Sequence, residues 1–418
     1  MNKKQVIFLW VIAAALAVAV AAVKSAQNRG TASVTERSRG EKLLPEFPAG
    51  KVAAVTIEGA DGAVNLKQSG DGWVVEEREN YPANFQLLGS TLRTLTEVEV
   101  TQGLEAGPSY NPRFGMDRDA AAPEDHGLHL TFKDAAGANL ESLALGKETQ
   151  SDANSNPMMM MQSAGGRFVR LASDPKAIYV ISESFPRVTA DPKDWLKDEF
   201  VKIEKIKSIT LRAPEDSGFA PWTLTRTAEI GDFTLEDMPE GKQINVTAVN
   251  PLKNFFSFAR FEDVVPAGEA AKQSDPAQKR QAVITTFDGF TYTLDIVPKK
   301  SPVPAREGAP TPPQNYFLTV KVEATLPTER SKPAEETEEE AKSRDEAFQQ
   351  RLKDLEKKLA TEQRFAGRTF EVTQWTVNAL LKPRADLIQD KGTTPGQGVG
   401  GRATSPPFQL PPQGIPGR

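Results

Sequence analysis

The longest unbroken hydrophobic run in the chain lies near its beginning. Every residue from Val6 to Val23 is apolar, and Lys3 and Lys4 stand just before this run. As a helix rising about 1.5 Å per residue, the run measures roughly 27 Å, close to the ~30 Å of a bilayer's hydrocarbon core. Signal peptides have shorter hydrophobic cores of roughly 7–15 residues, followed by a small-residue cleavage motif. We therefore expect an uncleaved transmembrane helix, with cleavage as a signal peptide as the alternative.

Beyond residue 50, short alternations of apolar and polar residues recur twice in the same order. Such alternation predicts half-buried β-strands. The matching stretches are residues 51–57 with 205–211, 72–75 with 221–224, 128–132 with 283–287, 167–171 with 316–320, 179–182 with 370–373, and 192–196 with 383–387. The sequence therefore predicts an α+β fold made by tandem duplication of a mostly antiparallel β unit.

Each of the two copies also contains one stretch with helical periodicity. Apolar residues follow one another at intervals of three, four and three, which places them on one face of a helix. They are Phe85, Leu88, Leu92 and Leu95 in the first copy and Val249, Leu252, Phe256 and Ala259 in the second. Asn84 is positioned to cap the first helix, and Pro251 suits the first turn of the second. We expect one helix packed on the sheet of each copy.

These patterns divide the chain into consecutive parts. The parts are a cytoplasmic tip with the transmembrane anchor at residues 1–24, a polar tether at 25–49, the first repeat at 50–200, the second repeat at 201–390, and a tail rich in proline and glycine at 391–418. Two domains of about 150 residues can each bury a core of their own. The tail has too few hydrophobic residues to fold, and we expect it to be disordered.

The second copy carries a charged insertion at residues 333–366, and the loop at 148–166 is assigned to the equivalent place in the first copy. Within the insertion, Phe348, Leu352, Leu355 and Leu359 follow a heptad-like spacing. This spacing predicts a helix of coiled-coil type with a narrow apolar stripe, which something must cover. Two hypotheses follow: the helix folds back on its own domain, or these four residues dock a partner helix.

Charge and composition exclude several classes of function. The formal net charge of −5 splits into +5 for residues 1–42 and −10 for the remainder. An acidic body lacks the clustered basic face that nucleic-acid binding requires, whereas the basic first segment suits lipid headgroups. The chain contains no cysteine, which excludes disulfides, thiolate metal sites and a lipid-modified cysteine anchor.

A search for catalytic and metal-binding motifs is negative. His126 and His129 are the only histidines, and the chain contains no HExxH motif. The strand pattern around them predicts that His129 lies on the solvated face, away from His126. Glu97 and Glu99 share one face of a short segment, as in a solvated edge rather than an acid and base pair. We predict no catalytic, cofactor-binding or metal-binding residues, and no cofactor.

Several structural motifs resemble those of the family called domain of unknown function 4340. They are the Leu43-Leu44-Pro45 entry, the strand at residues 51–57, the Trp73 strand and the Pro82-Ala83-Asn84 helix start, behind a single N-terminal membrane helix. Members are commonly encoded beside gliding-motility-type ABC transporter components, so the resemblance implies an accessory role outside the cytoplasm. It implies no catalytic residues, and the usual form of the family lacks so long a charged insertion.

We expect a non-enzymatic accessory or scaffold protein with a single pass through the inner membrane and most of its chain in the periplasm. Its expected partner is an envelope protein, such as an ABC transporter complex. One alternative is a module that binds cell-wall polymer or glycan between the two copies, and another is an enzyme of unidentified type. Glycan binding requires exposed aromatic rings, whereas we expect Trp73, Trp195, Trp222 and Trp375 to pack in cores.

Overall fold

The computed structural model describes residues 35–149, 166–300, 314–330, 332 and 335–392. The predicted membrane helix at residues 6–23 and most of the predicted tail lie outside these residues. Within the described ranges, no helix is both long enough and apolar enough to cross a membrane. The described residues form two compact units, one made mainly of residues 35–199 and the other mainly of residues 200–392.

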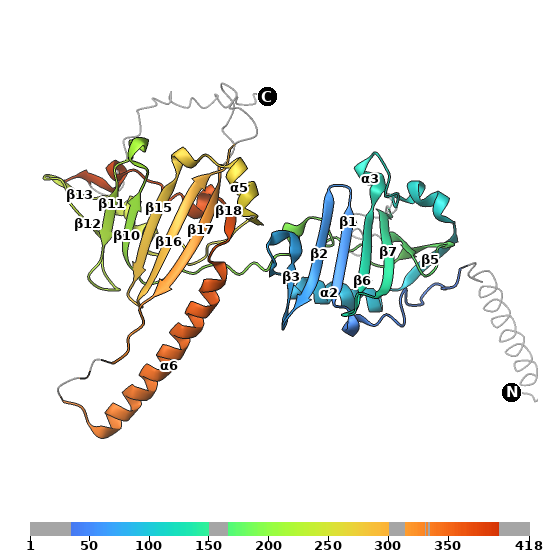
Figure 1. The fold of residues 1–418 in the computed structure, drawn as a ribbon, viewed down its shortest axis with the longest axis horizontal. Coiled ribbons are helices and arrows are strands. Elements are labelled where there is room, and N and C mark those ends of the chain that lie inside the picture. The colour runs from blue at the N-terminus through green and yellow to red at the C-terminus, as the bar shows by residue number, and fades with distance from the viewer. Residues whose placement is uncertain (1–34, 150–165, 301–313, 331, 333–334, 393–418) are drawn as a thin grey trace, which may run out of the picture. The chain divides into compact units, whose positions relative to one another are not determined.

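The first unit is built on an antiparallel sheet (Figure 1). In chain order its strands are β1 (Ala54–Gly59), β2 (Gly62–Ser69), β3 (Gly72–Val75), β4 (Tyr81–Pro82), β5 (Val100–Glu105), β6 (Leu128–Lys133), β7 (Asn139–Glu148), β8 (Arg167–Leu171) and β9 (Ala177–Ile181). Across the sheet they follow the order β4-β3-β2-β1-β6-β7-β8-β9-β5. Val55 of β1 lies between Leu66 of β2 and Phe132 of β6, and all three are buried. The alternation seen in the sequence therefore gathers the hydrophobic residues on one face of the sheet.

Helix α2 (Phe85–Glu97) lies across one face of this sheet (Figure 1). Its predicted cap is confirmed, because the Asn84 side chain accepts a hydrogen bond from the Leu87 backbone N–H at 3.1 Å. The buried face differs from the predicted one. Phe85 is 64% exposed, and Leu87 takes its place beside the buried Leu88. Phe85 is the first helical residue and has no preceding turn to pack against, so burial begins two residues later.

The second unit is also built on an antiparallel sheet. Its strands are β10 (Ile206–Arg212), β11 (Trp222–Thr225), β12 (Thr234–Leu235), β14 (Asp263–Val265), β15 (Arg280–Thr286), β16 (Phe290–Pro298), β17 (Asn315–Ala324) and β18 (Thr369–Thr373). Across the sheet they follow the order β12-β11-β10-β15-β16-β17-β18-β14. A separate small sheet pairs β13 (Lys242–Ile244) with β19 (Ile388–Asp390). The predicted α+β class with antiparallel sheets is therefore confirmed.

One prediction about the helices of the second unit is wrong. They are α4 (Val246–Val249), α5 (Ala267–Gln273), α6 (Glu338–Glu362) and α7 (Gln374–Val377). The single helix predicted across residues 249–259 is not formed, because α4 ends at Val249 and a 3-10 turn, η6 (Asn250–Lys253), follows. Pro251 has no N–H to donate to the Thr247 carbonyl, so the α-helix cannot continue through it. Leu252 and Phe256 are nevertheless buried.

The two sheets share a strand order once β4 is set aside. The shared order shows that two pairs of segments matched in the sequence do not occupy the same position in the two units. Trp73 lies on β3, which has the position of β12, whereas Trp222 lies on β11, which has the position of β2. The insertion that contains α6 joins β17 to β18, so its counterpart is the turn at residues 172–176 between β8 and β9, not the loop at 148–166.

Candidate partner-binding helix

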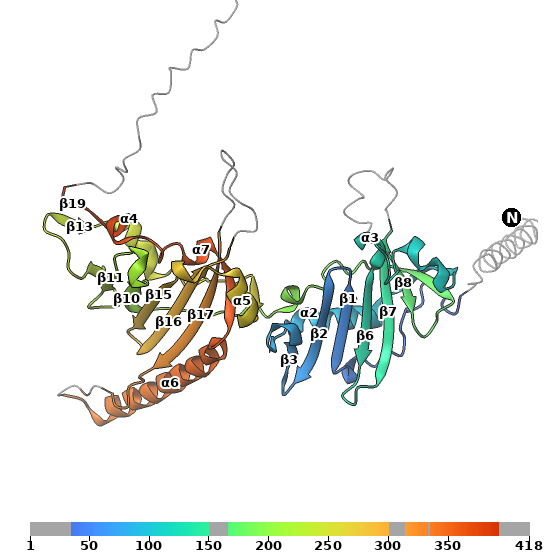
Figure 2. The same ribbon diagram turned by 45° about the horizontal axis from the view of Figure 1, so that its top comes forward.

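Helix α6 stands out from the second unit at one end and joins it at the other (Figures 1 and 2). It begins with a capping box: the Thr337 side chain accepts from the Glu340 N–H, and the Glu340 carboxylate accepts from the Thr337 N–H at 3.1 Å. The hydrogen bond from the Thr337 backbone lowers the pKa of Glu340. The first turn carries acidic side chains only, which suit the positive end of the helix dipole. The helix start is thus specified locally, without help from a core.

The last turns of α6 are attached to the sheet by charged side chains. Arg351 Nη2 lies 2.6 Å from Asp288 Oδ1, at the turn between β15 and β16. Burial alone would raise the pKa of Asp288, but hydrogen bonds from Arg351 and Lys205 outweigh it and hold that pKa below its usual value. The Lys358 ammonium lies 5.2 Å from the centre of the Phe290 ring, a cation–π contact. These contacts fix the direction in which α6 leaves its unit.

A buried acid lies at the end of the helix. Glu362 is only 4% exposed, and it lies among the sheet residues near Tyr292, which is fully buried. Tyr292 and the Lys202 backbone act on the Glu362 carboxyl as hydrogen-bonding neighbours, and Lys358 Nζ is 3.8 Å from Glu362 Oε1. Burial raises the pKa of Glu362, and burial together with the charge of Glu362 raises the pKa of Tyr292. An ionised Glu362 therefore costs the unit stability.

The first turns of α6 are braced by an ion-pair network. Arg330 donates to both carboxylate oxygens of Glu336, with Nη2–Oε2 at 2.7 Å and Nη1–Oε1 at 3.0 Å, and its Nε bonds the Asp345 carboxylate. Arg344 Nη1 adds a contact of 3.2 Å to Glu336 Oε1. Glu336 and Asp345 raise the pKa of Arg330. A bidentate pair of this kind restricts direction as well as distance, so the network holds the protruding turns against the segment before them.

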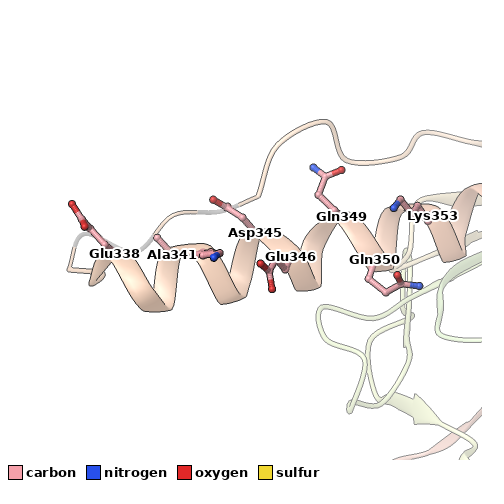
Figure 3. A pocket seen from close by; sticks show the side chains of 8 residues that line it. Glu338, Ala341, Asp345, Glu346, Gln349, Gln350 and Lys353 are labelled. Atoms are coloured by element: carbon pink, nitrogen blue, oxygen red, sulfur yellow. The ribbon is translucent and has the colours of Figure 1, made fainter.

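One face of the protruding turns forms an open hollow of about 600 Å³. It is lined by residues at helical spacing, namely Glu338, Ala341, Lys342, Asp345, Glu346, Gln349, Gln350 and Lys353. Figure 3 shows Asp345 and Gln349 on one side of the helix and Glu346 and Gln350 on the other. Within the described part of the chain, these lining side chains all come from α6. Small-molecule sites are usually enclosed and mostly apolar, so this polar face suits an elongated protein segment better.

The four predicted docking residues lie along one face of α6. Leu355 is buried against its own unit, whereas Phe348, Leu352 and Leu359 are half-buried. Their docking to a partner stays a prediction. Sequence analysis missed Arg330 and the buried Glu362, because their roles depend on segments that meet only in the folded unit. A basic residue shortly before the Thr337 capping box was the available signal.

The histidines are arranged differently from the prediction. His129 is only 8% exposed, not solvated, and its Nε2 lies 3.1 Å from the backbone oxygen of His126. The short helix α3 (Pro123–His126) supplies that oxygen, so the segment before β6 covers the strand's outer face. Burial first, and then the charge of Arg118, lower the pKa of His129. No cluster of three metal-ligating side chains occurs within the described part of the chain.

The comparison with known families gives one result. The model of the family described as Domain of unknown function (DUF4340) matches residues 73–281, which is half of the chain. The chain therefore belongs to this family, and the resemblance seen in the sequence is confirmed. No curated protein and no solved structure matches the chain. The matched residues end before α6 begins, so the helix lies outside the part that defines the family.

Proposed function

We propose that this protein is a non-enzymatic accessory or scaffold protein of the cell envelope, and that α6 is its docking site for a partner protein. The observation that carries the proposal is the contrast along α6. Its last turns are rooted in the second unit, whereas the turns at residues 338–353 present an exposed polar face held by the Arg330 network. Preorganised surfaces lose less conformational entropy on binding, so such a braced helix favours association.

We further propose that the anchor is the run at residues 6–23, with both units on the periplasmic side of the inner membrane. The length and the uninterrupted hydrophobicity of that run support this assignment. The family resemblance implies neighbours of the ABC transporter class, so a transporter complex in the same membrane is the proposed partner. An anchored scaffold meets such a partner at a high effective concentration.

The duplication of an α+β unit is also part of the proposal. The shared strand order supports it. So do Asn84 and Asn245, which each cap the helix that follows the edge strands of their unit. Two single 3-10 turns, η4 (Pro192–Trp195) and η9 (Arg384–Leu387), occupy the matching stretches predicted near the end of each copy. On this history, α6 is an addition to the second unit.

Photocrosslinking in native membranes tests the docking site. The chain has no cysteine, so Gln350→Cys introduces a unique attachment point for a benzophenone probe within the hollow. Asp71→Cys, in an exposed turn of the first unit, is the matched control. We expect an adduct with an integral envelope protein from position 350 only, lost when Glu338→Lys and Glu346→Lys are added. Equal labelling from both positions, or no adduct from either, contradicts the proposal.

Alkaline extraction and N-terminal sequencing test the anchor separately. We expect the full chain to stay in the membrane pellet and to retain the residues before Lys24. A mature chain that begins beyond Lys24 and is released into solution contradicts the anchor. The photocrosslinking result tests the docking site separately.

A further inference from the structure

A second surface feature lies in the same unit, on elements away from α6. Phe258 is 93% exposed and Trp375 is 83% exposed. The segments that carry them lie side by side, because the Thr376 hydroxyl is 3.4 Å from the Arg260 backbone oxygen. Rings that are so fully exposed project outward rather than line a cleft. Large aromatic side chains on a surface mark an interaction site, since a folded chain gains by covering them.

The prediction that Trp375 packs in a core is therefore wrong, although Trp73, Trp195 and Trp222 are buried as expected. Trp375 lies on the short helix α7, whose buried face is taken by Val377. In so short a helix only one side can reach the core, and Trp375 is on the other side.

The charge around the two rings favours an anionic surface. The segments at residues 251–261 and 374–384 contain basic residues and neither aspartate nor glutamate, and the acidic pair Glu262 and Asp263 follows the first segment. Lys253 pairs with Asp232 at 2.7 Å, and Arg384 and Lys382 donate to backbone oxygens, whereas no described acidic side chain pairs with the exposed Arg260. Arg260 is therefore available to an outside anion.

The two units differ in net charge, and this affects whether each can approach an anionic surface. Residues 43–199 carry 14 basic and 24 acidic side chains, a net charge of −10, whereas residues 200–418 carry 30 of each and are neutral. A strongly acidic unit is repelled by anionic lipid, and a neutral one is not. The aromatic rings and Arg260 thus lie on the unit that can approach an anionic bilayer.

We propose that Phe258, Trp375 and Arg260 form a contact site for the surface of an anionic phospholipid bilayer. Tryptophan and phenylalanine rings partition into the headgroup region, and arginine binds lipid phosphates. The contact does not require α6 to bind a partner. Its biological setting rests on the proposed anchor, which would keep the second unit close to the membrane.

A fluorescent probe near Trp375 tests the contact with the full chain. Asn378 is exposed and lies three residues after Trp375, so Asn378→Cys is labelled with a nitrobenzoxadiazole dye. Asp216→Cys, exposed in another turn of the unit, is the matched control. The protein is mixed with vesicles of phosphatidylglycerol and phosphatidylethanolamine. We expect a blue shift and quenching by lipids labelled near the headgroup at position 378 only. Phe258→Ser with Trp375→Ser should abolish both, and Arg260→Gln should remove the dependence on phosphatidylglycerol.

The outcomes separate this inference from the proposed anchor. Flotation of the Phe258→Ser, Trp375→Ser variant with the vesicles reports on the anchor alone. If that variant floats but the parent protein gives no blue shift, the anchor holds and the lipid contact is refuted. If the parent gives the blue shift and the variant does not float, the contact holds and the anchor is refuted. A probe that responds only to isolated wall glycan, or only to a membrane protein, also refutes the lipid contact.

Discussion

One connection shows how differently the two units use the same order of strands. In the first unit, residues 172–176 join β8 to β9 and close over Arg170, which is buried. In the second unit, residues 325–368 make the equivalent connection and contain α6. The first unit therefore uses this corner to hold itself together, whereas the second extends it into solvent. Function is more readily placed on the second unit, because the residues of this longer connection are not needed to complete the sheet.

Among the substitutions predicted to change stability, replacing Arg170 should cause the largest loss. A small loss would contradict the comparison between the two units. The guanidinium donates to the carbonyl oxygens of Ala106, Gly107, Pro175 and Ala177 and to the side chain of Asn111. Arg170→Met removes this donor from the buried Ala106 and Ala177 and from three less buried acceptors, so we expect a loss of about 3–5 kcal/mol from the free energy of unfolding of the first unit. Urea titration followed by hydrogen exchange in peptides of each unit measures it.

Arg113→Met is the control for that experiment, since Arg113 is exposed in the same unit. It should change the stability by less than about 0.5 kcal/mol. A similar small effect for Arg170→Met would mean that the corner of the first unit does not depend on the buried guanidinium.

Two glycines in turns at equivalent positions of the two sheets give a second test of the comparison between the units. Gly137 and Gly289 both have positive φ, +81° and +85°, and each lies in the turn that joins a pair of adjacent strands. A Cβ on Gly289 would lie 2.3 Å from the Thr325 carbonyl oxygen, at the start of the connection to α6, whereas a Cβ on Gly137 meets nothing within 4 Å. We expect Gly289→Ala to cost roughly 3 kcal/mol and Gly137→Ala about 1 kcal/mol. Thermal unfolding of both variants measures the difference, and equal costs would contradict the close approach.

The attachment of α6 to its unit should produce a smaller effect. Leu355→Ala removes a buried side chain from the helix root, and we expect a loss of about 2 kcal/mol together with faster hydrogen exchange in α6. Glu356→Ala, at the exposed next position, should change little. If both variants behaved alike, α6 would not be part of the core of the second unit, and the docking proposal would lose its fixed base.

Much of the fold was predictable because the strands alternate clearly. The patterns at residues 128–132 and 316–320 fall within β6 and β17, and Asn84 caps α2 as its chemistry suggests. These features depend on neighbours in the sequence. Several of the errors concern burial, as with the exposed Phe85 and the covered His129. Burial depends on which segment covers a side chain, and that segment lies elsewhere in the chain.

The candidate site was predictable only in outline. The heptad-like spacing correctly predicted a helix containing Leu355, and the structure describes it as α6. The Arg330 network and the exposed Trp375 were not predictable, because ion pairs and exposure arise when separate segments meet. The position of the insertion was also wrongly assigned, because the connection between β17 and β18 is much longer than the one between β8 and β9 and offers little sequence to compare with it.

The smallest predicted effect concerns pH and tests whether the root of α6 is built for stability. Folding raises the pKa of Glu362, so the folded chain holds its proton over a pH range in which the unfolded chain has lost it. Stability is therefore highest below the unfolded pKa of about 4.3 and falls as the pH rises toward the raised folded value. Glu362→Gln cannot ionise, and at about pH 8 it should be more stable than the parent by about 1 kcal/mol.

That advantage should vanish at about pH 3, well below the unfolded pKa, where Glu362 is protonated in both states. Urea titrations of the second unit across this range measure it, with Glu356→Gln as an exposed control on the same helix. The groups facing the carboxyl are Tyr292, Lys358 and Glu204, and Lys358 is the only cation among these three. A variant that matches the parent at about pH 3 but is less stable than the parent at about pH 8 would show that Lys358 more than compensates the buried charge. Polar contacts would then stabilise the root of α6, as they do the Arg170 corner of the first unit, and the contrast between the two units would narrow to the exposed turns of the helix.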